Sequence, residues 1–206
     1  KLPQDFNGDY LATVNANVGG GKTDVLIRQK IILESDISSV GKLTNNLKIN
    51  REHQAINEDD PWYKAANINF IQILTLPNVI SAKITGGEDR DIKSNIDYKK
   101  SSYETDPDLE ILETQNSFGR KNFSTWTKSK AGEVKTITMT YDNDKKIDFK
   151  KPFVFIYEKQ SGIDSVFEYS ISAPIGYKWR ESGSPIYKYS SENTPARLIL
   201  ELHLIR

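Results

Sequence analysis

Apolar and polar residues alternate along most of this chain. In segment 42–52, Leu43, Asn45, Leu47 and Ile49 fall on one face, which is apolar from 43 to 49 except for Asn45, while the residues of the other face are polar. Segments 134–142 and 197–206 repeat the pattern. Because successive side chains of a strand point to opposite faces of a sheet, this alternation predicts half-buried strands.

Further strands are predicted between turn signals such as Gly86-Gly87 and Asp142-Asn143-Asp144. Their expected ranges are 9–16, 25–38, 67–76, 79–85, 109–115, 122–128, 152–159 and 165–172. No segment shows a sustained helical period with capping residues at both ends. The pattern predicts an all-β fold with little helix: an antiparallel β-sandwich, either immunoglobulin-like or a larger two-sheet sandwich.

Two polar stretches, 57–66 and 86–108, are predicted to be long loops, and the second has a candidate edge strand at 95–99. We expect a single domain over 1–206. An alternative sub-boundary lies at 148–152, but the residues beyond it are few for an independent core.

Composition removes several classes of function. The chain of 206 residues has 28 Lys and Arg against 28 Asp and Glu, so no overall basic field favours nucleic acid. It has no cysteine, which excludes thiolate catalysis, disulfides and sulfur-ligated metals. The apolar runs are too short to cross a bilayer. The chain opens at Lys1 without a signal-peptide pattern, and we expect it to be part of a longer protein.

The segment "NANVGGGKTD" at 15–24 resembles a phosphate-binding loop but lacks its pattern. The first glycine of GxxxxGK[ST] would fall at Ala16, and the following residues predict a strand instead of a helix. We therefore predict a structural bend between two strands, in which glycines permit positive φ and the two flanking polar residues cap the turn. Its residues are Asn17, Gly19, Gly20, Gly21, Lys22 and Asp24.

Other candidate chemistry is sparse. His203 is expected on the polar face of a strand and His53 in solvent at a strand end, so neither predicts a metal site. Asp142 and Asp144 are weak calcium candidates, because their loop lacks the glycine and distal glutamate of a calcium loop. A Ser-His-Asp triad stays open, since its members can lie anywhere in a sequence, but no GxSxG elbow supports one. We assign no catalytic residues and no cofactor.

Four aromatic residues are candidates for a stacking surface that would bind a sugar or a partner protein: Trp62, Tyr63, Tyr177 and Trp179. The alternative, which we favour, is that Trp62, Trp126 and Trp179 fill the core between the sheets.

Within residues 9–33, the segment "DYLATVNANVGGGKTDVLIRQKI" (9–31) resembles the C-terminal region of the bacterial envelope family domain-of-unknown-function 4012. Asn17, Gly19, Gly20, Lys22 and Asp24 match its Asn-to-Asp turn. The order of later segments is also similar, through "KLTNNLKINREH", "NINFIQILTLPNVI", "FGRKNFSTWTKSKAGEVKTITMTYD" and "YEKQSGIDS". The resemblance implies an extracytoplasmic part of a protein tethered by an N-terminal membrane helix. It implies no activity, because none is established for the family.

Three hypotheses follow. The leading one is a non-catalytic extracytoplasmic module, structural or interacting, of a membrane-tethered bacterial envelope protein, with a cell-envelope glycan or protein as partner and no nucleic acid. The second is a glycan-binding module, which requires the four candidate rings to be exposed side by side. The third is a hydrolase or transferase acting on envelope polymers, which requires a cleft that holds an acid with a raised pKa.

Overall fold

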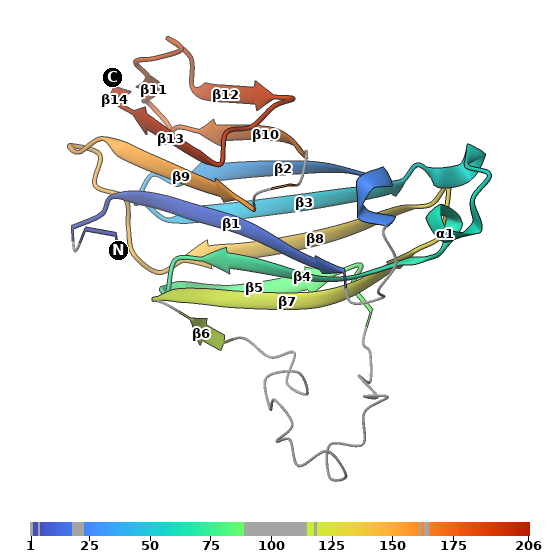
Figure 1. Cartoon of the computed structure of the whole chain (residues 1–206). Coiled ribbons are helices and arrows are strands. Elements are labelled where there is room, and N and C mark those ends of the chain that lie inside the picture. Colours follow the sequence, from blue (N-terminus) through green and yellow to red (C-terminus); the bar gives the residue numbers. More distant parts are fainter. Residues whose placement is uncertain are drawn as a thin grey trace.

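The computed structural model is a two-layer β-sandwich (Figure 1). It describes residues 2–3, 5–17, 23–88, 115–117 (backbone only), 119–160, 162 and 165–206. The two large sheets each have six strands in the described part of the chain. The fold is therefore mostly β, and of the two predicted sandwiches it is the larger two-sheet form.

The first sheet has the strand order β13-β9-β1-β4-β7-β6. Its strands are β1 (Gly8–Asn17), β4 (Asn67–Thr75), β6 (Gln115–Ser117), β7 (Arg120–Ser129), β9 (Phe153–Lys159) and β13 (Arg197–Leu202).

The second sheet has the strand order β12-β10-β2-β3-β8-β5. Its strands are β2 (Ile27–Ile37), β3 (Leu43–His53), β5 (Val79–Thr85), β8 (Val134–Asn143), β10 (Ser165–Ser172) and β12 (Ile186–Ser191). A short ribbon pairs β11 (Lys178–Trp179) with β14 (Leu204–Ile205).

Both large sheets are mixed, which corrects the prediction of a purely antiparallel sandwich. β9 runs parallel to β1, and β10 runs parallel to β2, while the other large-sheet pairings are antiparallel. The error has a simple cause. Alternation fixes which face of a strand is buried, but it says nothing about which strand lies beside it or in which direction.

The core lies between the two sheets and is built from the inward positions of the alternating strands. Leu43, Leu47 and Ile49 of β3 are buried, as their spacing predicted, and Ile137 and Met139 of β8 face the same core. Aromatic rings from β9 and β10 fill the space nearest the C-terminal strands: Phe155 stacks on Tyr169, and Tyr157 on Phe167.

Short helical elements occur where long loops were expected. The predicted 57–66 loop includes the end of η2 (Ala55–Asn57) and all of α1 (Pro61–Lys64), whose first turn is capped by Asp60. Another 3₁₀ turn, η1 (Thr23–Leu26), takes the start of the predicted strand 25–38. β12 was not predicted. Residues 89–108, with the candidate strand 95–99, and 109–114 lie outside the described residues. In the part that is described, no helix has both the length and the apolar character needed to cross a membrane.

Candidate functional site

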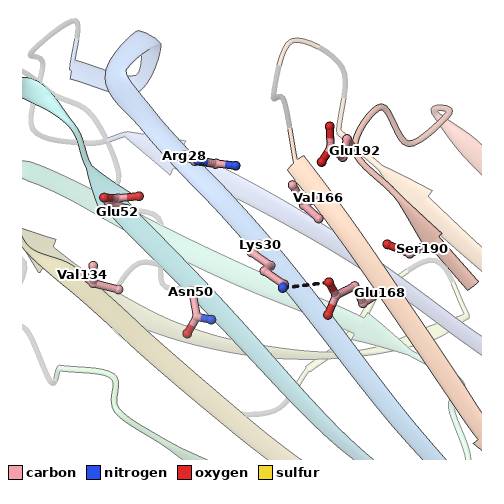
Figure 2. A pocket seen from close by; sticks show the side chains of 9 residues that line it. All are labelled: Arg28, Lys30, Asn50, Glu52, Val134, Val166, Glu168, Ser190 and Glu192. Carbon is pink, nitrogen blue, oxygen red and sulfur yellow. Dashed lines mark ion pairs between the residues drawn. The ribbon is translucent and has the colours of Figure 1, made fainter.

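A charged groove of about 430 Å³ lies on the outer face of the second sheet (Figure 2). It crosses five neighbouring strands, from β12 through β10, β2 and β3 to β8. Its lining residues alternate with the core positions of these strands, so sheet formation itself points them outward. They are Arg28, Lys30, Asn50, Glu52, Val134, Val166, Glu168, Ser190 and Glu192.

One ion pair occupies the middle of the groove. The Lys30 Nζ lies 2.8 Å from the Glu168 Oε1, with the two side chains 41% and 39% exposed. A pair this exposed is worth about 1 kcal/mol or less, because water screens it. It can therefore be rearranged by a ligand at little cost.

Three further charged side chains line the groove. Within the described part of the chain, Arg28, Glu52 and Glu192 make no side-chain hydrogen bond and no ion pair. Arg28 and Glu52 are direct cross-strand neighbours, yet the Arg28 side chain turns away from Glu52 and into the groove (Figure 2). The groove thus holds one free guanidinium between free carboxylates.

A second hollow of about 370 Å³ adjoins the first. The two share Glu168 and Ser190, and the second adds Lys188 of β12 and Glu34 of β2. Each volume is within the range of small-ligand sites, roughly 300–1,000 Å³.

Two polar clusters are sealed inside the sandwich, at opposite ends of β3. In the first, Asp9 of β1 crosses the core and accepts hydrogen bonds from Asn45 Nδ2 at 2.8 Å and Asn143 Nδ2 at 2.9 Å. Ser35 donates to Asn45 Oδ1 at 2.6 Å. Burial raises the pKa of Asp9 to about 6, although the hydrogen bonds it accepts oppose that rise.

The second cluster surrounds Arg51, a residue that is only 2% exposed. Its guanidinium donates at 2.7 Å to the side-chain oxygens of both Asn15 and Gln29, and at 3.4 Å to Asn67 Oδ1. The carboxylate of Asp24 is 3.7 Å away and is half exposed. Burial lowers the pKa of Arg51 to about 10, an effect that Asp24 opposes.

The four candidate stacking residues do not form one surface. Trp179 is fully buried and donates its indole N–H to the Ile171 carbonyl, so it is a core residue. Trp62, on α1, is 60% exposed at one end of the sandwich, whereas Tyr177 directly precedes β11 at the other end (Figure 1). Tyr63 is half-buried beside Trp62 in α1. The core-filling alternative holds for Trp179 but not for Trp62, which is exposed. Trp126 is buried, but it lies on the outer face of the first sheet beside Phe70, opposite to the face that carries Phe123 and Ile71 of the core.

The predicted structural bend is only partly visible. Gly19, Gly20, Gly21 and Lys22 lie outside the described residues. Asp24 is in the first turn of η1, where its carboxylate accepts a hydrogen bond from Asn67 Nδ2 at 2.8 Å. Asn17 ends β1. The strand β2 follows η1, as the failure of the phosphate-loop pattern predicted.

The two histidines differ. The prediction that His53 is solvated is wrong, because its side chain turns inward at the end of β3 and is fully buried. His203 lies at the surface, where its Nδ1 is 2.8 Å from Glu181 Oε1. Strand alternation continues to His53, but a polar residue at a strand end is not recognisable as buried until the neighbouring loop is placed.

The calcium candidates are not assembled into a site. Asp142 accepts a hydrogen bond from Thr44 and pairs with Lys42 at 2.8 Å, and the bond to Lys42 lowers the pKa of its carboxyl. Asp144 is exposed. No group of three or more His, Asp or Glu side chains with metal-binding geometry occurs among the residues that the structure describes.

The groove residues were not found from sequence. Lys30 and Glu168 stand at ordinary polar positions of their strands, far apart in the chain. Only the parallel pairing of β10 with β2 brings them together.

Comparison with known proteins gives a fold but no family. No protein-family model matches this chain, and no curated protein matches it. The crystal structure of a "putative nutrient binding protein" from Legionella pneumophila subsp. pneumophila str. Philadelphia 1 is similar over 96% of this chain and 72% of that chain. The TM-score is 0.53 and the sequence identity 10%, so the likeness is one of fold.

Proposed function

We propose that this chain is a non-catalytic interaction module that binds a polar partner in the groove on the outer face of its second sheet. The observation that carries the proposal is the set of opposite charges of Arg28, Glu52 and Glu192 around a hollow of ligand size, which make no ion pair with any residue that the structure describes. Charges left free in a hollow are available to a ligand without the loss of existing bonds.

The ligand expected from this arrangement carries both an anionic and a cationic group. A carboxylate would pair with Arg28, and an ammonium group would pair with Glu52 or Glu192. Amino acids and short peptides have this chemistry. The structural neighbour is named as a nutrient binding protein, and that name agrees with such a ligand without identifying it.

A non-catalytic role is supported by the location of the perturbed acid. A hydrolase or transferase needs an acid with a raised pKa in a cleft that the substrate can reach. The pKa of Asp9 is raised to about 6, but this carboxyl is fully buried between the sheets. A glycan-binding role is less well supported, because Trp179 is buried and Trp62 and Tyr177 lie at opposite ends.

The cellular setting that we propose is the extracytoplasmic part of a membrane-tethered bacterial envelope protein. It rests on the resemblance of residues 9–33 to domain-of-unknown-function 4012. Protease treatment of intact cells tests it: digestion of this region is expected, and full protection would contradict the placement.

The groove is tested by NMR titration of the ¹⁵N-labelled protein with three separate probe pools: amino acids, short peptides and neutral oligosaccharides. We expect one of the first two pools to shift amide signals of β2, β10 and β12. Arg28→Ala should weaken that binding at least about tenfold, as expected when a charge pair worth more than about 1.4 kcal/mol is lost. Lys48→Ala is the matched control. Lys48 is an exposed cation on the outer face of β3, as are the groove residues Asn50 and Glu52 of that strand, but it does not line the groove.

Three outcomes would contradict the proposal. Binding of the oligosaccharide pool alone would favour the glycan-binding alternative. Conversion of any probe to a product, detected by mass spectrometry, would favour an enzyme. A titration in which no pool shifts the groove signals would remove the groove as the binding site.

A further inference from the structure

The short elements η1, η2 and α1 lie together at one end of the sandwich (Figure 1), and each of them carries an exposed apolar side chain. Val25 of η1 is 75% exposed, Ile56 of η2 63% and Trp62 of α1 60%. The helix α1 lies beside both 3₁₀ turns. We call Val25, Ile56 and Trp62 the apical patch. Grouped exposed apolar side chains are a mark of interaction sites, whereas single ones are common on any surface.

The first element of the apical patch is fixed to the core through the Arg51 cluster. Asn67 Nδ2 donates to Thr23 Oγ1 at 3.0 Å and to Asp24 Oδ1 at 2.8 Å, and Thr23 is fully buried. Arg51 faces the same aspartate. η1 therefore presents Val25 from a turn whose first two residues are held by the sandwich interior.

The other two elements are joined by buried His53. Its Nδ1 accepts a hydrogen bond from the Ala55 N–H of η2 at 3.4 Å, and its Nε2 lies 3.0 Å from the Ala65 carbonyl after α1. This pattern fits the neutral tautomer with the proton on Nε2. In addition, Asp60 Oδ1 caps α1 by accepting from the Trp62 N–H at 2.8 Å. One buried side chain thus sets the positions of both η2 and α1.

Such anchoring matters for binding, because a surface that is already ordered loses little entropy when a partner docks. Tryptophan is also among the residues that contribute most to interface affinity. We propose that the apical patch is a docking surface for a protein segment that carries an apolar side chain flanked by lysine or arginine.

The charge of the partner follows from the charge around the apical patch. Segments 23–26 and 55–65 contain Asp24, Glu58, Asp59 and Asp60 against Lys64. The turn before β8, whose Gly132 lies against Ile56, adds Lys130 and Glu133, which balance each other, so the surroundings stay acidic. The charge of Asp24 is paired with Arg51. The remaining acids, Glu58, Asp59 and Asp60, form an acidic rim beside Trp62. This rim attracts basic residues, and it repels both an anionic membrane and the same patch of a second copy.

The test is a selection from a phage library of random short peptides on the wild-type protein, with subtraction on the Trp62→Ser variant. Enriched peptides should combine apolar residues with Lys or Arg. By calorimetry, the affinity of a synthetic copy should fall about tenfold with Ile56→Ser and with Val25→Ser, because each change removes apolar contact area worth about 1.5 kcal/mol. The affinity should also fall as salt is raised.

Val40→Ser is the matched control, because Val40 is 64% exposed but lies in the turn before β3, at the strand end opposite η2. Val25→Ser and Ile56→Ser change residues outside α1. If Trp62→Ser disrupts α1, these two variants still test the apical patch. An equal loss with Val40→Ser, enrichment of acidic peptides or no enrichment at all would overturn the proposal. So would dimerisation or binding to anionic vesicles that is lost with Ile56→Ser.

Discussion

Asp9 and Arg51 are buried charges of opposite sign at opposite ends of the core, each surrounded mainly by neutral amides. Burying a charge costs free energy unless hydrogen bonds replace water. Here the bonds come from both sheets, since Asp9 and Asn15 belong to β1 while Asn45 and Arg51 belong to β3. At residue scale, these contacts link the sheets in one relative alignment.

Asp9 is predicted to make the protein less stable as pH rises from about 4 to about 7. The pKa is 3.8 in the unfolded reference and about 6 in the fold. The folded state therefore binds more protons in this range, and its stability falls as they leave. The free energy of unfolding should therefore change by about 3 kcal/mol in total, since each unit of pKa shift corresponds to about 1.4 kcal/mol.

Urea unfolding of the wild type and of Asp9→Asn, at about pH 4 and at about pH 7, measures this effect. The free energy of unfolding of wild type should fall relative to that of Asp9→Asn by about 3 kcal/mol from low to neutral pH. The exposed Asp36→Asn variant of β2 controls for the removal of a carboxylate. Parallel pH profiles for wild type and Asp9→Asn would show that this carboxyl is not the source.

At the scale of elements, the parallel pair of β1 and β9 depends on a close backbone approach. β1 begins at Gly8, which is opposite Val154 of β9. A Cβ atom built on Gly8 would lie 1.9 Å from the Val154 carbonyl oxygen, far inside van der Waals contact. No side chain fits there without moving one strand.

Gly8→Ala should therefore lower the free energy of unfolding by about 2 kcal/mol or more, as overpacked sites do. The control is Gly176→Ala, where a Cβ meets no atom within 4 Å and only the positive φ of +84° adds strain, worth about 1 kcal/mol. Urea midpoints compare the two. A Gly8→Ala midpoint equal to that of Gly176→Ala would mean that β9 shifts without cost.

At the scale of the whole molecule, the N-terminal and C-terminal parts of the chain share both sheets. β9 and β13 complete the first sheet beside β1, and β10 and β12 complete the second beside β2. The stacked rings of Phe155 on Tyr169 and Tyr157 on Phe167 join the two sheets from within this C-terminal part. The core of the N-terminal strands is thus partly built by residues beyond 152.

A fragment of residues 1–150 is therefore predicted not to fold by itself. It loses the pairing of β1 and β2 with their parallel neighbours and exposes Leu11, Ile31 and Leu33 of the core. The amide dispersion of its NMR spectrum, compared with that of the whole chain, measures this. A well-dispersed fragment spectrum would instead place a domain boundary at the alternative position, 148–152.

The sequence by itself determined the strands that alternate clearly, and which of their faces is buried. Alternation identified β3 and β8 with their core residues, because burial of one sheet face leaves a period of two in any sequence. It also marked Asn45 as the polar exception on a core face, and the failed glycine pattern indicated that a strand follows residue 24.

Only the tertiary structure decided which residues meet. The parallel pairings and the charged groove bring together residues that are distant in sequence. The apical patch combines three separate short elements, and His53 is buried by the loop that follows its strand. A local pattern reports whether a side chain faces water or core, since that depends on its own strand. It does not report the partner, because the partner is set by the arrangement of both sheets as a whole.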